Sequence, residues 1–222
     1  MKNFYLFIIF LLTSCFLLFA SPSVEDIQSL SLKDMKKIES WLKDKNTSPR
    51  FRVMILEKIN ILLLENKNNL LEYGNTLLDL FSYLFKENIA QGSSYSLVLR
   101  KKTCLMLGYF NSTEHKSNAY ELLKTEIELD SDGDVASACI RSLGEYVEKK
   151  DESVKFINKL LDSSLKKKKI TDEDIEVAQA CLELYGKFKM KQSILTLMRI
   201  LDSKYPTEIK NLSKQILESI PQ

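Results

Sequence analysis

The sequence is poor in the residues that build tight turns and in the residues that most often carry chemistry. Its 222 residues include only 6 Gly, 4 Pro, 1 His and 1 Trp. So few glycines and prolines argue against a turn-rich all-β fold. The prolines at 22, 49, 206 and 221 also leave long stretches free to be helical. Since Leu, Lys, Glu and Ile are plentiful and helices accept them well, the composition favours an all-α fold.

The chain also lacks an excess of charge of one sign. Its 32 basic and 30 acidic residues give a formal net charge of +2. A nearly neutral chain gives no electrostatic reason to expect nucleic acid or an anionic lipid surface as a partner. The 45% hydrophobic content is ordinary for a folded protein with a real core. We therefore predict no nucleic-acid partner.

The motifs of the common enzyme and metal classes are missing. The sequence has no P-loop, dinucleotide fingerprint, G-x-S-x-G, CxxC or Cys/His cluster. We interpret His115 as an exposed residue in the first turn of a helix. The acidic stretch Asp130–Asp134 looks like a calcium loop, but Val135 and Arg141 occupy the places of the required Gly and Glu. We predict a capped turn there, with no catalytic residue, metal site or cofactor.

The N-terminus has the layout of a secretory signal peptide. A short positive stretch, Met1–Asn3, precedes the almost wholly apolar run Phe4–Phe19. The chain then turns polar after Ala20, where cleavage is expected. This predicts a signal peptide at 1–20 and an exported protein of residues 21–222, in the periplasm or associated with the cell envelope. If the apolar run is retained, it is about the minimum that can span a bilayer, and membrane contact is expected only through that anchor.

A second interpretation of the N-terminus involves Cys15. Leu12-Thr13-Ser14-Cys15 resembles the lipobox of bacterial lipoproteins, in which the cysteine becomes the lipidated first residue of the mature protein. The apolar run Phe16–Phe19 follows, where lipoproteins usually turn polar. We favour Cys15 as a small residue within the signal segment. Lipidation of Cys15 remains the alternative, which would make the protein an envelope-anchored lipoprotein with a structural role.

Apolar residues at helical spacing predict helices along nearly the whole chain after the signal segment. Ser48-Pro49 is a strong helix start, with Ser as N-cap and Pro at the first position. Thr171 and Asp174 are spaced as a capping box. The second helix of each predicted pair begins near residue 49, 93, 132, 171 or 206. The predicted helices cover 32–42, 49–64, 70–85, 95–110, 114–129, 135–149, 151–165, 175–188, 191–201 and 207–220.

A short pattern occurs three times, at 103–110, 138–146 and 180–188. Each copy holds a small residue, a cysteine, a bulky residue near a glycine, and an aromatic residue two places after the glycine. The three glycines, at 108, 144 and 186, are 36 and 42 residues apart. A period of this length predicts a stacked helical repeat.

The three cysteines of the pattern occupy near-equivalent repeat positions. Such positions are expected about 10 Å apart, given helix-packing distances, which is beyond the reach of a disulfide. We therefore predict that Cys104, Cys139 and Cys181 are buried small hydrophobic residues rather than partners in a bridge.

Two segments resemble the second helix of HEAT repeats, with an acidic opening, a small residue and a bulky residue before glycine. They are Asp132-Gly133-Asp134-Val135 with Ala138 and Leu143-Gly144, and Asp172-Glu173-Asp174-Ile175 with Ala178 and Tyr185-Gly186. Leu107-Gly108 keeps the pair without the acidic opening, so the resemblance covers about residues 95–190. It implies a right-handed α-solenoid of about five HEAT-like hairpins over 21–222. It also implies binding to other proteins and no activity.

The resemblance places the second helices on the concave face of the array. Aligned on the glycines, Lys101, Ser137 and Gln179 share one position, and Leu105, Arg141 and Glu183 share another. An ordinary wet surface of mixed charge is the alternative interpretation of these positions. The candidate residues for a binding groove are Lys101, Ser137, Arg141, Gln179 and Glu183.

These observations predict a non-catalytic protein–protein interaction scaffold in the cell envelope, with another protein as its partner. The alternatives are the lipid-anchored lipoprotein and an enzyme or small-ligand-binding helical domain. A deep pocket with converging polar groups would favour the enzyme or ligand-binding domain.

Overall fold

The structure is a computed structural model that describes residues 22–66, 68–89 and 94–221. These residues form α-helices and short 3-10 helices and no strand, so the all-helical prediction is confirmed for them. The α-helices are α2 (Val24–Gln28), α3 (Met35–Lys43), α4 (Pro49–Glu65), α5 (Asn69–Ile89), α6 (Ser94–Leu107), α7 (Lys116–Leu129), α8 (Gly133–Leu143), α9 (Lys150–Leu165), α10 (Asp172–Phe188), α11 (Ile194–Leu201) and α12 (Thr207–Ser219).

The N-terminal segment predicted as a signal peptide, including Cys15, lies outside the described residues. Among the helices that the structure describes, none is long and apolar enough to cross a membrane.

The chain divides into two compact units, one ending at Leu62 and one beginning at Leu63. In the first unit, α2, α3 and most of α4 bury aliphatic side chains, including Ile38, Leu42 and Ile59. The Ser48-Pro49 helix start is confirmed, because α4 begins at Pro49 and the Ser48 hydroxyl accepts a hydrogen bond from the Phe51 backbone N–H at 3.4 Å.

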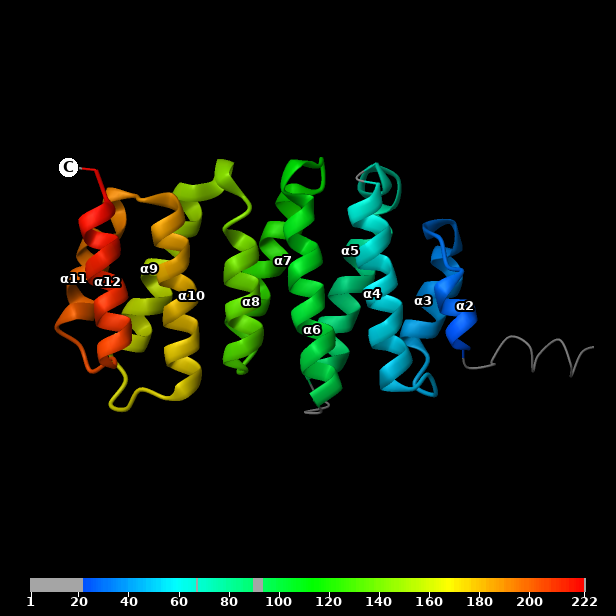
Figure 1. Ribbon diagram of the computed structural model, residues 1–222, viewed down its shortest axis with the longest axis horizontal. Coiled ribbons are helices and arrows are strands. Elements are labelled where there is room, and N and C mark those ends of the chain that lie inside the picture. The colour runs from blue at the N-terminus through cyan, green and yellow to red at the C-terminus, as the bar shows by residue number, and fades with distance from the viewer. Residues whose placement is uncertain (1–21, 67, 90–93, 222) are drawn as a thin grey trace, which may run out of the picture. The chain divides into compact units, whose positions relative to one another are not determined.

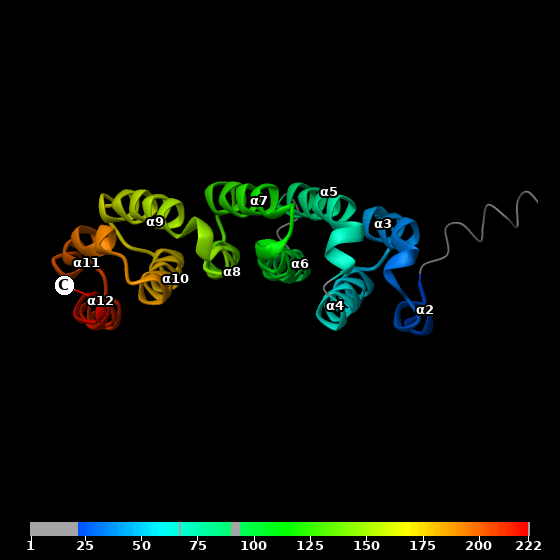
Figure 2. The same ribbon diagram turned by 90° about the horizontal axis from the view of Figure 1, so that it is seen from above.

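In the second unit, the helices lie in two rows. Figures 1 and 2 place α6, α8, α10 and α12 side by side in one row, and α5, α7 and α9 in the other. Within the first row, each helix packs against the next. The capping box predicted before α10 is confirmed: the Thr171 hydroxyl accepts from the Asp174 backbone N–H at 3.3 Å, and the Asp174 carboxylate accepts from the Thr171 backbone N–H at 3.0 Å.

The three glycines of the repeated pattern lie at the C-terminal ends of α6, α8 and α10. Each faces the next helix of its row. A Cβ atom added at the glycine would lie 3.5 Å from Ser142 for Gly108, 3.6 Å from Lys187 for Gly144, and 3.6 Å from Ile216 for Gly186. These are ordinary contact distances, so the glycines sit where neighbouring helices come close.

Helix α8 is shorter than the predicted helix 135–149. It ends at Leu143, and Gly144 is its C-cap. The chain then turns so that Tyr146 is buried, with its hydroxyl donating to the Leu107 carbonyl at 2.6 Å. The contact between α6 and this turn therefore ends the helix, which local sequence propensity does not reveal.

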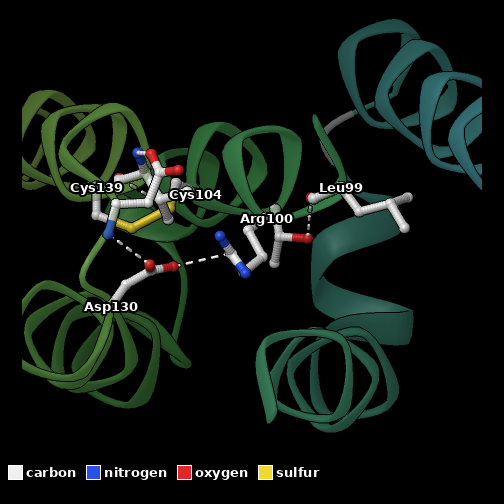
Figure 3. Close-up of a disulfide and its surroundings, with 8 residues drawn as sticks. Leu99, Arg100, Cys104, Asp130 and Cys139 are labelled. Atoms are coloured by element: carbon white, nitrogen blue, oxygen red, sulfur yellow. Dashed lines mark hydrogen bonds and ion pairs between the residues drawn. A yellow bond between two sulfur atoms is a disulfide. The ribbon is translucent and has the colours of Figure 1, made fainter. Parts of the chain in front are cut away.

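The prediction that the three cysteines are unbridged is wrong for two of them. Cys104 of α6 and Cys139 of α8 form a disulfide, with their Cα atoms 4.8 Å apart (Figure 3). Cys104 stands four residues before its glycine and Cys139 five. A shift of one residue turns a side chain by about 100° around a helix, so the two positions are not equivalent and can face each other. Cys181 is free and buried, as predicted.

The prediction that His115 is exposed is also wrong. Its side chain is buried, immediately before α7. The imidazole packs edge-to-face on Phe110, with ring centroids 6.5 Å apart, and occupies the space left by Gly74 of α5. A Cβ at Gly74 would lie only 2.2 Å from the ring. Gly74 is far from His115 in the sequence but close to it in space, and because it has no side chain it leaves room for the imidazole ring.

Candidate functional site

A cavity in the second unit opens at the C-terminal ends of α6 and α8. Its volume is about 540 Å³. We call it the apolar pocket. It is lined by Leu63, Leu64, Leu70, Leu105, Gly108, Tyr109, Asn111, Ser112, Ala138, Arg141, Ser142 and Glu145.

Small residues keep the apolar pocket open. Gly108 has no side chain, and it faces Ser142 and Glu145 of the α8 region. Ala138 is the residue of α8 one turn before Ser142, and it also lines the pocket. Because the residues between α6 and α8 have so little side-chain volume, the larger side chains of the lining surround the cavity and do not fill it.

Two leucines at the edge of the pocket are unusually exposed. Leu64 is 59% exposed and Leu105 is 51% exposed. Single exposed leucines are common on protein surfaces. Here, however, both belong to the lining of one cavity, so together they offer a single apolar contact surface.

Three polar side chains of the pocket, Arg141, Glu145 and Asn111, have partners on neighbouring elements. The Arg141 guanidinium contacts the Glu183 carboxylate at 2.7 Å, and the Lys187 ammonium contacts the Glu145 carboxylate at 2.9 Å. The Asn111 amide donates to the Glu145 backbone carbonyl at 3.2 Å. Because these ion pairs are about half exposed, each contributes at most about 1 kcal/mol to stability. They define one edge of the pocket as polar.

The structure brings only some of the predicted groove residues together. Arg141 and Glu183 form an ion pair, and the Gln179 amide donates to Glu183 at 3.2 Å. Lys101 lies apart from this cluster and pairs with Asp134 at 3.1 Å. Ser137 is only 2% exposed, so its hydroxyl is not on the open surface, and it is not part of the pocket lining.

Sequence reasoning missed the apolar lining of the site. Leu63 and Leu64 are adjacent, and adjacent residues of a helix point about 100° apart, so the two cannot both lie at the centre of its buried face. A second signal was available at Leu105, which shares a position with the polar residues Arg141 and Glu183 in the glycine alignment. A bulky apolar residue at a position that is otherwise polar indicates an exposed contact point.

A second depression of about 340 Å³ lies at the N-terminal ends of α8 and α10. We call its five carboxylates, Asp132, Asp134, Asp172, Glu173 and Glu176, the acidic patch. Close packing brings the two ends together, since a Cβ at Gly133 would lie 2.7 Å from the Glu173 Cα.

Local hydrogen bonds account for part of the acidic patch. Asp132 caps α8 by accepting from the backbone N–H groups of Asp134 and Val135 at 3.0 and 3.3 Å, and helix N-termini favour negative charge. Partial burial and the neighbouring carboxylates of Asp134 and Asp132 raise the pKa of Glu176. In the described residues, no group of three or more His, Cys, Asp or Glu side chains is arranged to hold a metal ion.

A buried charged cluster lies beside the disulfide (Figure 3). The Arg100 guanidinium of α6 contacts the Asp130 carboxylate at 2.8 Å, and both side chains are less than a tenth exposed. Glu126 of α7 is 2% exposed. Burial and the nearby Asp130 carboxylate raise the pKa of Glu126 to about 8, against the opposing effect of Arg100. Through the Arg100–Asp130 ion pair, this cluster ties the connection between α7 and α8 to α6.

No protein-family model, curated protein or solved structure matches this chain. The assignment of a site therefore rests on the geometry of the chain itself.

Proposed function

We propose that residues 21–222 form a HEAT-like α-solenoid that acts as a non-catalytic protein-binding scaffold. Three features support the solenoid: the resemblance of two second helices to HEAT repeats, the consecutive packing of α6, α8, α10 and α12, and the glycine of each helix facing the next. One hairpin cannot bury its own apolar face, and stacking hairpins provides the continuous core that it lacks.

The observation that carries the binding function is the apolar pocket with its exposed leucines. Leu64 and Leu105 leave apolar surface in water around a cavity of about 540 Å³. Burying a leucine side chain contributes about 1.5–3 kcal/mol, so a partner that covered these leucines would gain affinity from a small contact area. A few residues buried near the centre of an interface carry most of the binding energy in protein complexes.

The proposed place of action is the cell envelope. The signal-like N-terminus motivates this, and the Cys104–Cys139 disulfide supports it, because disulfides persist mainly in oxidising compartments. Mass spectrometry of the mature N-terminus distinguishes cleavage after Ala20 from lipidation of Cys15. An unprocessed Met1 on a protein recovered from the cytoplasm would contradict export.

The binding function is tested by affinity capture from envelope extracts with the tagged full chain. Leu105→Asp places a charge in the apolar pocket. Leu195→Asp is the matched control, since Leu195 of α11 is 59% exposed and lies outside the pocket. We expect one captured protein to be retained by the wild type and by Leu195→Asp, and to be lost with Leu105→Asp. Identical capture by all three proteins would refute a role for the pocket.

A small apolar ligand is the second candidate occupant. The volume of the pocket lies within the range of about 300–1,000 Å³ that is typical of small-molecule sites, and this observation alone favours it. Native mass spectrometry of the purified chain tests it. A bound small molecule that is absent from Leu105→Asp would support this candidate over a protein partner.

A further inference from the structure

The acidic patch adjoins the apolar pocket on the same row of helices. On α8, Ala138 lines the pocket and Asp134 belongs to the patch. These residues are one helical turn apart, which is about 6 Å along the axis. On α10, Glu183 pairs with the pocket residue Arg141, and Glu176 of the patch lies two turns before Glu183. A single bound segment could therefore cover both features.

The acidic patch has an excess of negative charge. Of its five carboxylates, Asp134 pairs with Lys101 at 3.1 Å, so five negative groups and one positive group leave a formal charge of −4. Lys and Arg side chains in the described part of the chain form no ion pair with the other four. Repulsion from neighbouring carboxylates also acts on Glu176, whose pKa is raised by burial and by Asp134 and Asp132.

The apolar pocket and the acidic patch together indicate which side chains a bound segment should carry. An acidic segment or a polyanion would meet repulsion at the patch, and like-charge contacts disfavour a wrong partner by several kcal/mol. A purely apolar ligand would fill the pocket and leave the patch unneutralised. A segment with apolar and cationic side chains satisfies both surfaces.

We propose that the partner presents a basic amphipathic helix, which inserts a bulky apolar side chain into the apolar pocket and lays Lys or Arg side chains over the acidic patch. The separation of one to two turns corresponds to basic residues about four and seven positions from the apolar anchor. The patch increases the association rate and selects the partner, while the pocket supplies most of the affinity. This inference rests on the proposed function and specifies the chemistry of its partner.

The test uses a phage-displayed library of random peptides, selected on the immobilised oxidised chain. We expect enrichment of peptides with net positive charge and with Leu, Phe or Trp at helical spacing from Lys or Arg. Their affinity should fall about tenfold when Glu173→Gln and Glu176→Gln are combined, and it should fall as salt rises, since salt screens exposed charges. The control is Glu128→Gln with Glu218→Gln, which neutralises two exposed carboxylates outside the patch.

The outcomes separate this inference from the proposed function. If the enriched peptides require Leu105 but carry no positive charge, the pocket binds proteins and the inference is overturned. If the enriched peptides bind Leu105→Asp as well as they bind the wild type, or if none is enriched, both fail. Circular dichroism of each variant confirms that its helices are retained.

Discussion

The α6–α8 and α8–α10 contacts join successive helices of one row by different means. Between α6 and α8 lie a disulfide, with the buried Arg100–Asp130 ion pair beside it, and a buried tyrosine hydroxyl bonded to a backbone carbonyl. Between α8 and α10, the polar links are the exposed pairs Arg141–Glu183 and, in the turn after α8, Glu145–Lys187. The links of the α6–α8 contact are buried, whereas the ion pairs of the α8–α10 contact are exposed to solvent.

This difference bears on where binding occurs. Toward their C-terminal ends, α8 and α10 pair their own charges in the polar stripe formed by Arg141–Glu183 and Glu145–Lys187, so a partner gains little by covering that part. The acidic patch lies at the opposite, N-terminal ends of the same two helices. The apolar pocket beside the α6–α8 contact leaves Leu64 of α4 and Leu105 of α6 exposed, next to two helices that a disulfide joins. A preorganised apolar site loses less conformational entropy when it binds, which favours the pocket over the polar stripe as the centre of an interface.

The largest expected effect comes from breaking the buried ion pair. Arg100→Met leaves the buried Asp130 carboxylate without its cation, and it should lower the free energy of unfolding by about 3–5 kcal/mol. Arg141→Met removes the exposed pair of the other contact and should cost no more than about 1 kcal/mol. Urea denaturation of both variants measures the difference. Equal losses of unfolding free energy for the two variants would show that the α6–α8 and α8–α10 contacts depend on their ion pairs to the same extent.

Removal of the disulfide should have the next largest effect. The bridge joins residues 35 apart, and closing a loop of this length in the unfolded chain stabilises the fold by about 3–4 kcal/mol. Cys104→Ala combined with Cys139→Ala should therefore lower the Tm by roughly 10 °C. Calorimetry with and without reductant provides the check. Cys181→Ala should keep the response to reductant, and a wild type that is insensitive to reductant would contradict the account.

Glu126 should make stability depend on pH. Its pKa rises from 4.5 to about 8 on folding, so the protonated carboxyl stabilises the folded state fully below about pH 4.5. That stability is lost as the pH rises to about 8, because the unfolded chain releases its proton first. The loss should be on the order of 5 kcal/mol. Denaturation across this pH range should give a flatter profile for Glu126→Gln, whereas the exposed Glu128→Gln should retain the wild-type slope.

The last prediction, with the smallest expected effect on stability, concerns the alignment of neighbouring helices. It tests whether α8 and α10 face each other with the same residue positions as α6 and α8. Ile140 stands four residues before Gly144, as Cys104 does before Gly108, and Cys181 stands five before Gly186, as Cys139 does before Gly144. Oxidised Ile140→Cys should therefore form a bridge to Cys181, which a non-reducing peptide map detects. Leu143→Cys, at another buried position of α8, should not. Free thiols in both variants would argue against a repeated register.

Local signals were sufficient to predict most of the helices. Ser48-Pro49 and the Thr171 capping box fixed two helix starts, since these signals act within a few residues of the helix end. Tertiary contacts decided the failures. The burial of His115 depends on the missing side chain of Gly74, and the early end of α8 depends on the Tyr146 contact with Leu107. Both contacts join residues that are far apart in the chain, so neither can be inferred from the local sequence.

Of the residues that line the apolar pocket, the sequence analysis named only Arg141 as a candidate, and binding at the candidate residues stays a prediction. The glycine alignment found Arg141, Gln179 and Glu183 because polar residues recur there. It did not find the apolar pocket, because the exposure of Leu105 depends on how little Gly108, Ala138 and Ser142 fill the space between the helices. The same alignment treated Cys104 and Cys139 as equivalent, although the shift of one residue between them was visible in the sequence.

Site-specific photocrosslinking in cells that make the full chain tests the central claim most directly. A photoreactive amino acid is placed at position 105 in the apolar pocket, and at position 195 in a matched control. If the pocket and the patch bind one partner together, position 105 should give one discrete protein adduct, reduced when Glu173→Gln and Glu176→Gln are added, and position 195 should give no such adduct. Absence of an adduct at 105, or equal adducts from both positions, would contradict the claim that the pocket and the acidic patch together bind a protein partner.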